Sequence, residues 1–205
     1  MSQAAEASHG TPATPTAGGA IDFLNFVGLL KTLKRTGWVR EGVTLPESVA
    51  DHQYRMGVMS LLITDDSVDK QRCTMMAIVH DLAEALAGDI TPLDGVTDED
   101  KHARELRALD QMLAALGEGT HAAALIKGLW EEYEAGATPE ALMVKDLDKF
   151  EMIVQADEYE REQSMDLSPF FASTAGYFKT TMVQEWDREL RRRRQERLAQ
   201  RQQNL

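Results

Sequence analysis

A short apolar stretch of the chain contains one histidine and two carboxylates at helical spacing. His80, Asp81 and Glu84 lie in the segment AIVHDLAEAL, where ionisable groups without partners are costly to bury. Glu84 follows His80 by four residues and Asp81 by three, so all three side chains can point to one side of a helix. A bound metal ion would compensate for their burial, and we interpret the stretch as part of a metal site.

Two further residues can complete such a site from other parts of the chain. His52, in ESVADH, offers a second imidazole, and Asp148, in VKDLDKFEM, offers a second carboxylate. Two neutral imidazoles and two carboxylates suit Mn²⁺, Co²⁺, Zn²⁺, Fe²⁺ or Mg²⁺. Such an ion acidifies the water it binds, to a pKa of about 7 on Zn²⁺, which provides a nucleophile for phosphorus at neutral pH. Taken singly, His52 could instead be a hydrogen-bonded core residue, and Asp148 could pair with Lys145 or Lys149.

The elements expected to carry these residues are helices. Apolar residues recur at three- and four-residue spacing along almost the whole chain, without a strand ladder, an internal repeat or a glycine-rich phosphate loop. Ser48 is expected to cap the helix that contains His52, and connections are expected at 35–48, 88–95 and 168–173. The pattern predicts an all-α fold, a compact bundle of about six to eight helices. The expected helices cover residues 21–35, 49–63, 70–87, 98–116, 120–135, 139–163 and 178 onwards.

The bulk composition is that of a globular protein with one compact domain. The chain has 205 residues, 43% of them apolar, and lacks the apolar run of about 18 residues that predicts a transmembrane helix, so no membrane-spanning segment is expected. Cys73 is the only cysteine, which excludes an intrachain disulfide and favours a reducing, cytoplasmic setting. Residues 1–19 lack the features of a targeting peptide and are expected to form a disordered tail. The domain is expected over 20–180, followed by a C-terminal helix with an arginine-rich tail over 181–205.

The charge of the chain is unevenly distributed. The formal net charge is −12, yet residues 187–205 contain seven arginines against three acids, a balance of +4 that leaves −16 for the remainder. A body this acidic is a poor binder of nucleic acid, and no nucleic acid polymer is expected as a partner. The basic tail could contact RNA, a membrane surface or an acidic partner, and the plain alternative is a solvated helix end.

The order of the candidate ligands, His52, then His80-Asp81, then Asp148, resembles the H…HD…D pattern of the HD-domain metal phosphohydrolases. The segments RTGW, PESVADH, VHDLAEALAGDITP and VKDLDKFEM resemble more closely the HD-domain 5′-deoxynucleotidases, both the bacterial enzymes and their eukaryotic relatives. This resemblance covers roughly residues 20–180, and both tails lie outside it. It implies an HD-domain helical bundle.

The resemblance also implies an activity. That family removes the 5′-phosphate from deoxyribonucleoside monophosphates, discriminates against ribonucleotides, tolerates different bases and is typically homodimeric. Carried over by position, Glu84 would be the catalytic carboxylate that positions or deprotonates the attacking water, and Asp89 a second functional acid near the phosphate or sugar. Trp38 would form the wall of the sugar pocket that excludes a 2′-hydroxyl. One divalent ion would be held by His52, His80, Asp81 and Asp148.

One departure from the bacterial pattern concerns the phosphate-binding arginine. Bacterial relatives place an arginine directly before the pocket tryptophan, where this chain has Gly37. The nearest upstream arginine is Arg35, in the spacing of the eukaryotic branch, and we predict that Arg35 binds the substrate phosphate. Arg35 could otherwise be a cation at a helix C-terminus, and Trp38 an apolar plug beneath a loop.

Three other functions remain compatible with these residues. A (p)ppGpp hydrolase uses a similar single-metal set, so only the RTGW and GDITP context separates it from a nucleotidase. A two-metal cyclic-nucleotide phosphodiesterase needs further histidines, and only His9, His102 and His121 remain. A non-catalytic nucleotide-binding or scaffold protein would have no need of the ion.

Overall fold

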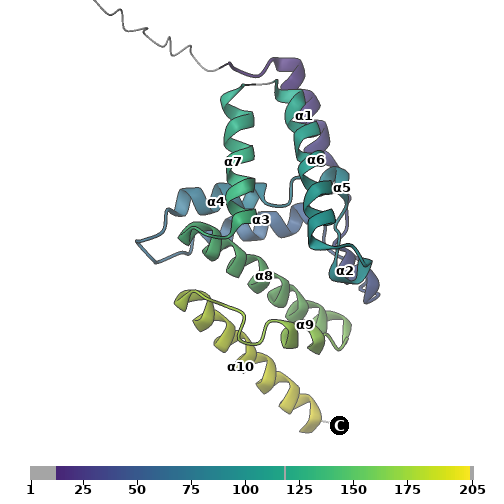
Figure 1. The fold of residues 1–205 in the computed structure, drawn as a ribbon. Coiled ribbons are helices and arrows are strands. Elements are labelled where there is room, and N and C mark those ends of the chain that lie inside the picture. The colour runs from purple at the N-terminus through teal and green to yellow at the C-terminus, as the bar shows by residue number, and fades with distance from the viewer. Residues whose placement is uncertain (1–12, 118, 204–205) are drawn as a thin grey trace, which may run out of the picture.

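The protein is helical throughout the part that the computed structural model describes, residues 13–117 and 119–203, and these residues contain no strand (Figure 1). The all-α prediction is therefore confirmed for this part, and seven of its helices have seven residues or more. The elements in chain order are α1 (Ala17–Leu29), α2 (Thr36–Arg40), α3 (Val49–Ser60), α4 (Lys70–Val79), α5 (Glu84–Ala87), the 3-10 turn η1 (Pro92–Asp94), α6 (Asp98–Leu116), α7 (His121–Ala135), α8 (Pro139–Gln163), α9 (Ser168–Ser173) and α10 (Thr181–Gln203).

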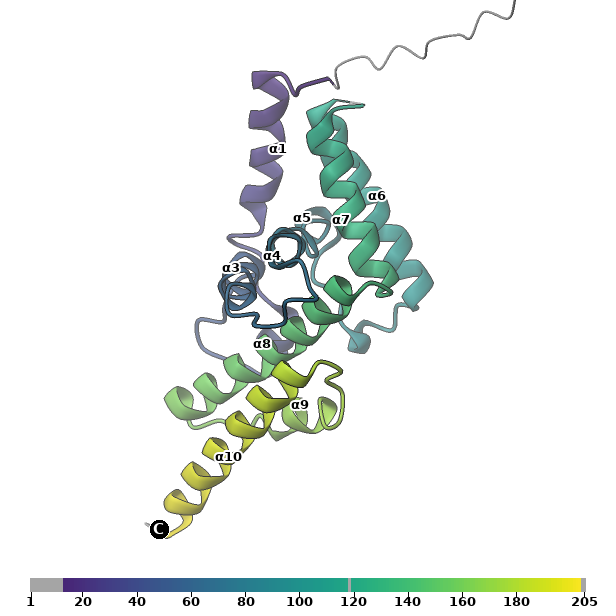
Figure 2. The ribbon, with the colours of Figure 1, turned by 90° about the vertical axis from the view of Figure 1, so that its left-hand side faces the viewer.

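The helices form three tiers (Figures 1 and 2). Helices α1, α6 and α7 stand side by side in the upper tier, α3 and α4 cross the middle, and α8 to α10 form the lower tier. Helix α4 contacts α3, α7 and α8, and α8 also contacts α3, α7, α9 and α10, so these two helices connect the tiers. The core between these helices contains fully buried apolar side chains such as Met56, Met76 and Leu147. No helix among the described residues combines the length and the apolar character needed to cross a membrane.

Helix α3 begins where its capping residue predicts. The Ser48 hydroxyl accepts a hydrogen bond from the Asp51 backbone N–H at 3.1 Å, and the Asp51 carboxylate accepts one from the Ser48 N–H at 2.8 Å. This reciprocal pair satisfies two N–H groups that a helix start leaves without partners. It fixes the first turn of α3, and His52 lies in that turn.

The predicted single helix over 70–87 is wrong. Helix α4 ends at Val79, and α5 begins only at Glu84. Between them the chain makes tighter hydrogen bonds that span three residues, from Leu82 N to Val79 O at 3.0 Å and from Glu84 N to Asp81 O at 3.1 Å. Neighbouring residues on a regular α-helix point about 100° apart, whereas this turn lets both His80 and Asp81 face the same cavity.

Three other boundaries also differ from the predicted ones. The predicted connection 35–48 contains the short helix α2, and the predicted connection 168–173 is the helix α9, with Pro169 in its first turn, where proline is tolerated. Helix α1 begins at Ala17, inside the predicted tail 1–19, whose residues 1–12 lie outside the described part.

Helix α10 is anchored to the body by arginines. Arg194 donates to the buried carboxylate of Glu160 at 2.7 Å, and Arg197 donates to Asp157 at 2.6 Å, both on α8. Arg191 donates to a backbone carbonyl of α9 at 2.8 Å. The interpretation of this segment as a solvated helix end is wrong for these three arginines, because they hold α10 against α8 and α9.

Candidate metal centre and active site

A cavity of about 790 Å³ opens between the turn after α4, the start of α2 and the helices α8 and α9. Seven of the eight predicted site residues line it, and the eighth, His52, lies behind them with its side chain fully buried. The lining members of the predicted set are Arg35, Trp38, His80, Asp81, Glu84, Asp89 and Asp148.

The predicted ligands converge from three elements at the floor of this cavity. His52 comes from α3, the His80-Asp81 pair from the turn after α4, and Asp148 from α8. The His80 Nε2 atom lies 3.1 Å from Asp81 Oδ2. The His52 Nε2 atom lies 3.8 Å from the same oxygen and 3.3 Å from Asp148 Oδ1. His52, His80 and Asp81 thus form a compact candidate metal site, with Asp148 beside it.

The two imidazoles are oriented as metal ligands need to be. The Nδ1 atom of His52 lies 2.5 Å from Glu151 Oε2, and the Nδ1 atom of His80 lies 2.9 Å from the Ala77 carbonyl oxygen. An Nδ1–H that donates to these acceptors leaves the lone pair on Nε2, the usual arrangement behind a metal-bound histidine. Both Nε2 atoms are buried and have no hydrogen-bond partner among the described residues. The site therefore fits a divalent cation.

The pKa of His52 depends on the charged groups around it. Burial and the nearby Arg35 lower the pKa of His52, but Glu151 and Asp148 outweigh them and raise it to about 9. A cation that binds at Nε2 must therefore displace a proton from this ring, so metal binding is expected to release protons near neutral pH.

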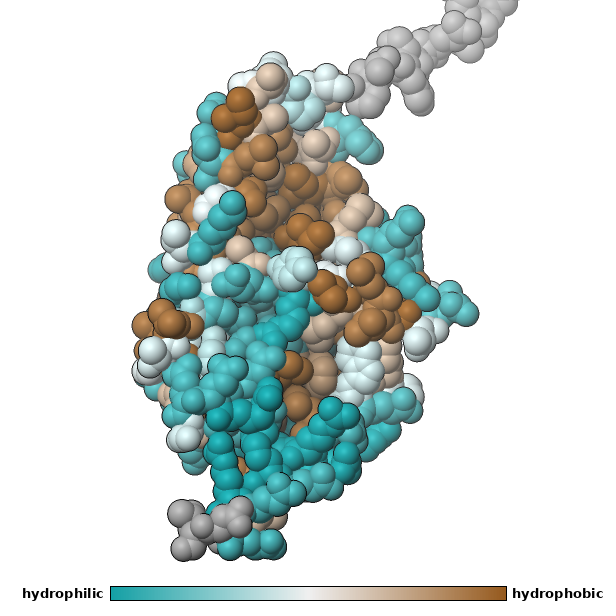
Figure 3. Space-filling model, turned by 180° about the vertical axis from the view of Figure 1, so that it is seen from behind, coloured by the Kyte–Doolittle hydropathy of each residue, from teal (hydrophilic) through white to brown (hydrophobic). Residues whose placement is uncertain are grey.

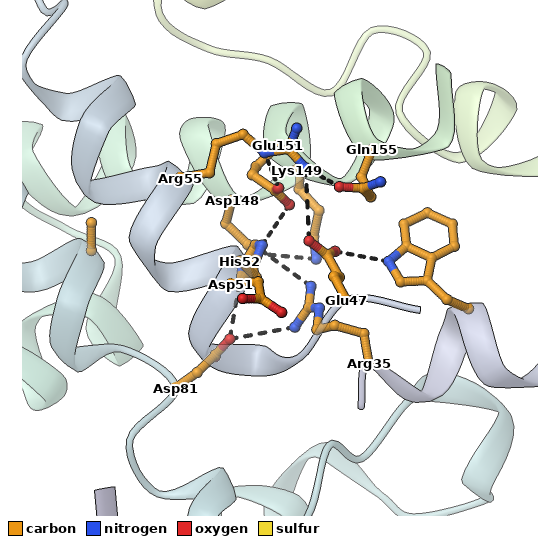
Figure 4. Close-up of polar contacts among 12 residues, drawn as sticks. Arg35, Glu47, Asp51, His52, Arg55, Asp81, Asp148, Lys149, Glu151 and Gln155 are labelled. Atoms are coloured by element: carbon orange, nitrogen blue, oxygen red, sulfur yellow. Dashed lines mark hydrogen bonds and ion pairs between the residues drawn. The ribbon is translucent and has the colours of Figure 1, made fainter. Parts of the chain in front are cut away.

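The sequence prediction missed Glu151 as part of the site. Its carboxylate is fully buried and bridges His52 to Arg55, whose Nε donates to Glu151 Oε1 at 2.7 Å (Figure 4). Glu151 follows Asp148 by three residues and so lies on the same side of α8. An acid one turn after a predicted ligand, in an apolar stretch, was the available signal.

Arg35 reaches into the cavity. Its Nη1 atom lies 3.4 Å from Asp81 Oδ2 and 3.6 Å from Asp89 Oδ1, and its Nη2 atom lies 3.9 Å from Asp148 Oδ1. The residue precedes α2 and lies six positions beyond the end of α1, so it is not a cation at a helix C-terminus. Figure 4 shows the guanidinium between Asp81 and Asp148.

Glu84 and Asp89 both line the cavity. Burial raises the pKa of Glu84 well above its ordinary value, and the charges of Asp81 and Asp89 raise it further. Asp89 is fixed by Thr36 at the start of α2, whose backbone N–H donates to its carboxylate and whose hydroxyl donates to its carbonyl at 2.7 Å. These bonds tie the GDITP segment to the RTGW segment.

Trp38 lines the cavity but is only 2% exposed. Its indole N–H donates to Glu47 Oε1 at 2.8 Å, and the edge of Tyr159 packs on it with ring centroids 5.4 Å apart. Phe170 of α9 packs on Trp38 with a centroid distance of 4.5 Å and lines the cavity as well. The two rings together form the aromatic wall of the cavity.

Comparison with known proteins assigns this fold. A sequence model described as an HD domain matches residues 27–187. The chain belongs to the HD domain family. This HD domain is 48% identical over 160 residues to the 5′-deoxynucleotidase HDDC2 of Danio rerio, covering 77% of this chain and 79% of the relative. It is 44% identical over 181 residues to the 5′-deoxynucleotidase HDDC2 of Homo sapiens, covering 87% and 88%.

A solved structure supports the same assignment. The HD domain-containing protein YGK1 aligns with a TM-score of 0.66 and 33% identity over 90% of each chain. The resemblance predicted from the four sequence segments is thereby confirmed. The residues of the candidate site lie within the matched range of the HD domain.

Proposed function

We propose that this HD domain is a 5′-deoxynucleotidase, which hydrolyses deoxyribonucleoside 5′-monophosphates to a deoxynucleoside and inorganic phosphate. The observation that carries the proposal is the pair of buried imidazole nitrogens that have no hydrogen-bond partner in the described part of the chain and that face Asp81 and Asp148 beside Arg35. The cavity of about 790 Å³ is of the size that small-molecule ligands occupy. The substrate class follows from relatives that bear this name at 42–48% identity.

The proposed cofactor is one divalent cation, held by His52, His80, Asp81 and Asp148. The two nitrogen and two carboxylate ligands suit Mn²⁺, Co²⁺, Zn²⁺, Fe²⁺ or Mg²⁺. When bound, such an ion supplies an acidified water and draws charge from a phosphate oxygen.

The proposed roles of the surrounding residues follow from their positions. Arg35 binds the phosphate, because its planar guanidinium offers two parallel N–H donors at the mouth of the ligand cluster. Glu84 positions or deprotonates the attacking water, and burial together with the charges of Asp81 and Asp89 raises the pKa of its carboxyl above the ordinary value. Asp89 lies next to Arg35 and is the second functional acid, near the phosphate or the sugar of the substrate. Trp38 forms the sugar wall that excludes a 2′-hydroxyl.

A second copy of the chain is the proposed macromolecular partner. Hydrophobic side chains cluster on the face that is turned away from the viewer in Figure 1 and is seen in Figure 3. Figure 2 shows α1 and α3 on that side of the molecule. A contiguous apolar surface of this kind marks an interaction site in a globular protein. We propose that it is the interface of a homodimer, as the resemblance implies. We propose that it includes exposed hydrophobic residues of α1, α3, α4 and the turn after α3, namely Ile21, Leu24, Tyr54, Val58, Leu61, Leu62, Met75 and Ile78.

The setting and extent of the domain are part of the same proposal. We infer a cytoplasmic location from the single cysteine, which is buried in α4. The proposed bounds remain 20–180 for the HD domain and 181–205 for the C-terminal helix and its tail, and no nucleic acid polymer is proposed as a partner.

A substrate comparison tests the proposed activity against its rivals. Purified protein with added Mn²⁺ or Co²⁺ is offered dAMP, (p)ppGpp and cyclic AMP in parallel, and the products are separated by chromatography. We expect inorganic phosphate from dAMP alone. Turnover of (p)ppGpp or cyclic AMP in its place would assign another HD phosphohydrolase activity. Nucleotide binding without any turnover would indicate a non-catalytic binding protein.

A further inference from the structure

Lys149 is one of several basic residues that line the cavity, and it lies beside a predicted metal ligand. It lines the cavity from α8, and its Nζ atom lies 3.3 Å from Asp148 Oδ2. Its side chain is 41% exposed, in contrast to the neighbouring carboxylate of Asp148 at 11%. The sequence pattern pointed to Lys149 only as an ion-pair partner of Asp148.

The two oxygens of Asp148 have different neighbours. Oδ1 faces the metal site, 3.3 Å from His52 Nε2 and 3.9 Å from Arg35 Nη2. Oδ2 accepts a hydrogen bond from the Tyr133 hydroxyl at 3.2 Å and lies next to Lys149. Because Tyr133 already satisfies Oδ2, Asp148 does not require Lys149. Arg35 and Lys149 thus approach the same carboxylate at its two different oxygens, and Figure 4 shows both side chains directed toward it.

The charge of the substrate calls for a second cation. A phosphate monoester carries nearly two negative charges at pH 7, since its second pKa is about 6. Arg35 supplies one positive charge, but Asp81, Glu84 and Asp89 surround it with acidic groups. The ammonium group of a lysine is a compact charge with three rotatable donors, which complements the fixed fork of an arginine.

We propose that Lys149 is a phosphate-binding residue that, together with Arg35, holds the non-bridging oxygens of the substrate's 5′-phosphate. This assignment rests on the proposed function. Its neighbour Lys145, one turn earlier on α8, also lines the cavity, but its Nζ atom lies 4.1 Å above the ring of Tyr133. Lys149 is the lysine of α8 whose Nζ atom lies within ion-pair distance of a predicted metal ligand, Asp148.

The test compares Lys149→Met with Lys127→Met. Lys127 is a matched control, since it also pairs with an aspartate, Asp110, and is 40% exposed, but it does not line the cavity. The affinity for inorganic phosphate is measured by calorimetry at saturating Mn²⁺, and KM and kcat are measured with dAMP. A charged hydrogen bond of about 1.5–3 kcal/mol corresponds to a loss of roughly 10-fold or more in phosphate affinity. We expect this loss, with a similar rise in KM, for Lys149→Met alone.

Two results would overturn the assignment. Phosphate affinity and KM within about twofold of the unmodified protein would show that Lys149 does not bind the phosphate. A lower Mn²⁺ affinity with unchanged phosphate affinity at saturating Mn²⁺ would show that Lys149 only supports Asp148. If the unmodified protein bound phosphate but released none from dAMP, the proposed function would fail, and the calorimetry would still decide the role of Lys149.

Discussion

At the scale of single residues, the surroundings of His52 explain how a fully buried imidazole is available for a cation. Glu151 fixes one ring nitrogen, and Arg55 in turn fixes Glu151. The second ring nitrogen is left facing Asp81 and Asp148. Such a carboxylate behind a histidine sets its tautomer and raises its basicity as a ligand.

Glu151→Gln is expected to weaken metal binding without removing a ligand. The loss of a carboxylate that hydrogen-bonds a metal-binding histidine lowers metal affinity by roughly 10- to 100-fold. The affinity is measured by competition with a chromogenic chelator. Glu158→Gln is the control, because Glu158 also pairs with Arg55 but makes no contact with His52. Equal metal affinities for the two variants would contradict the role assigned to Glu151.

Glu84→Gln is expected to separate binding from catalysis. The amide keeps the size of the side chain but cannot accept a proton, and general-base catalysis contributes roughly 10²- to 10⁴-fold. We expect metal content and phosphate affinity to remain as in the unmodified protein, and kcat with dAMP to fall by at least about 100-fold. A near-normal kcat would remove Glu84 from the mechanism.

The residues that form the site could be predicted from the sequence. The residues that hydrogen-bond them and fix their orientation could not. His80 and Asp81 stand out because ionisable groups in an apolar stretch need compensation. The pairing of His52 with Glu151 joins residues 99 positions apart, and it exists only because α3 packs on α8. No spacing rule along the chain carries that information.

At the scale of elements, the break between α4 and α5 is the feature that positions the metal pair. The apolar periodicity of 70–87 predicts a continuous helix, since it records which residues face the core. It does not record whether hydrogen bonds span three or four residues. By contrast, the start of α3 could be predicted, because the capping interaction of Ser48 and Asp51 is local in sequence.

Helix α10 offers a matched pair of arginines for a stability test. Arg194 pairs with the buried Glu160, whereas Arg193 is 70% exposed and, among the described residues, pairs only with Glu189 in its own helix. Removing one partner of a buried pair costs about 3–5 kcal/mol, and Arg197 still reaches Glu160 at 3.1 Å. We expect Arg194→Met to lower the free energy of unfolding by about 2 kcal/mol, and Arg193→Met by less than about 0.5 kcal/mol. Equal denaturation midpoints would show that α10 is not anchored through Glu160.

At the scale of the whole molecule, the acidic body and the apolar face determine which partners the protein can bind. The net charge of −12 opposes association with nucleic acid, and arginines of α10 are already paired with acids of α8. The hydrophobic face over α1 and α3 is the surface at which we propose that a partner binds (Figure 3). A second copy of the chain is the partner that we propose.

Leu61→Glu tests this interface. Leu61, which directly follows α3, is 68% exposed, so a charge there costs little in the folded monomer but would be buried in a dimer. We expect sedimentation to show a dimer for the unmodified protein and a monomer for the variant. Leu142→Glu, on α8, is the control and should remain dimeric. A monomeric unmodified protein, or a dimeric Leu61→Glu variant, would contradict the proposed surface.

The most direct test of the central claim is phosphate release from matched deoxyribonucleotides and ribonucleotides. The protein is treated with EDTA, Mn²⁺ or Co²⁺ is added back, and kcat/KM is measured for dAMP and AMP, dCMP and CMP, and dGMP and GMP. We predict release from the deoxy members only, none after EDTA, and full recovery with the added ion. Equal rates for the two sugars, or release that EDTA does not affect, would contradict a metal-dependent 5′-deoxynucleotidase at this site.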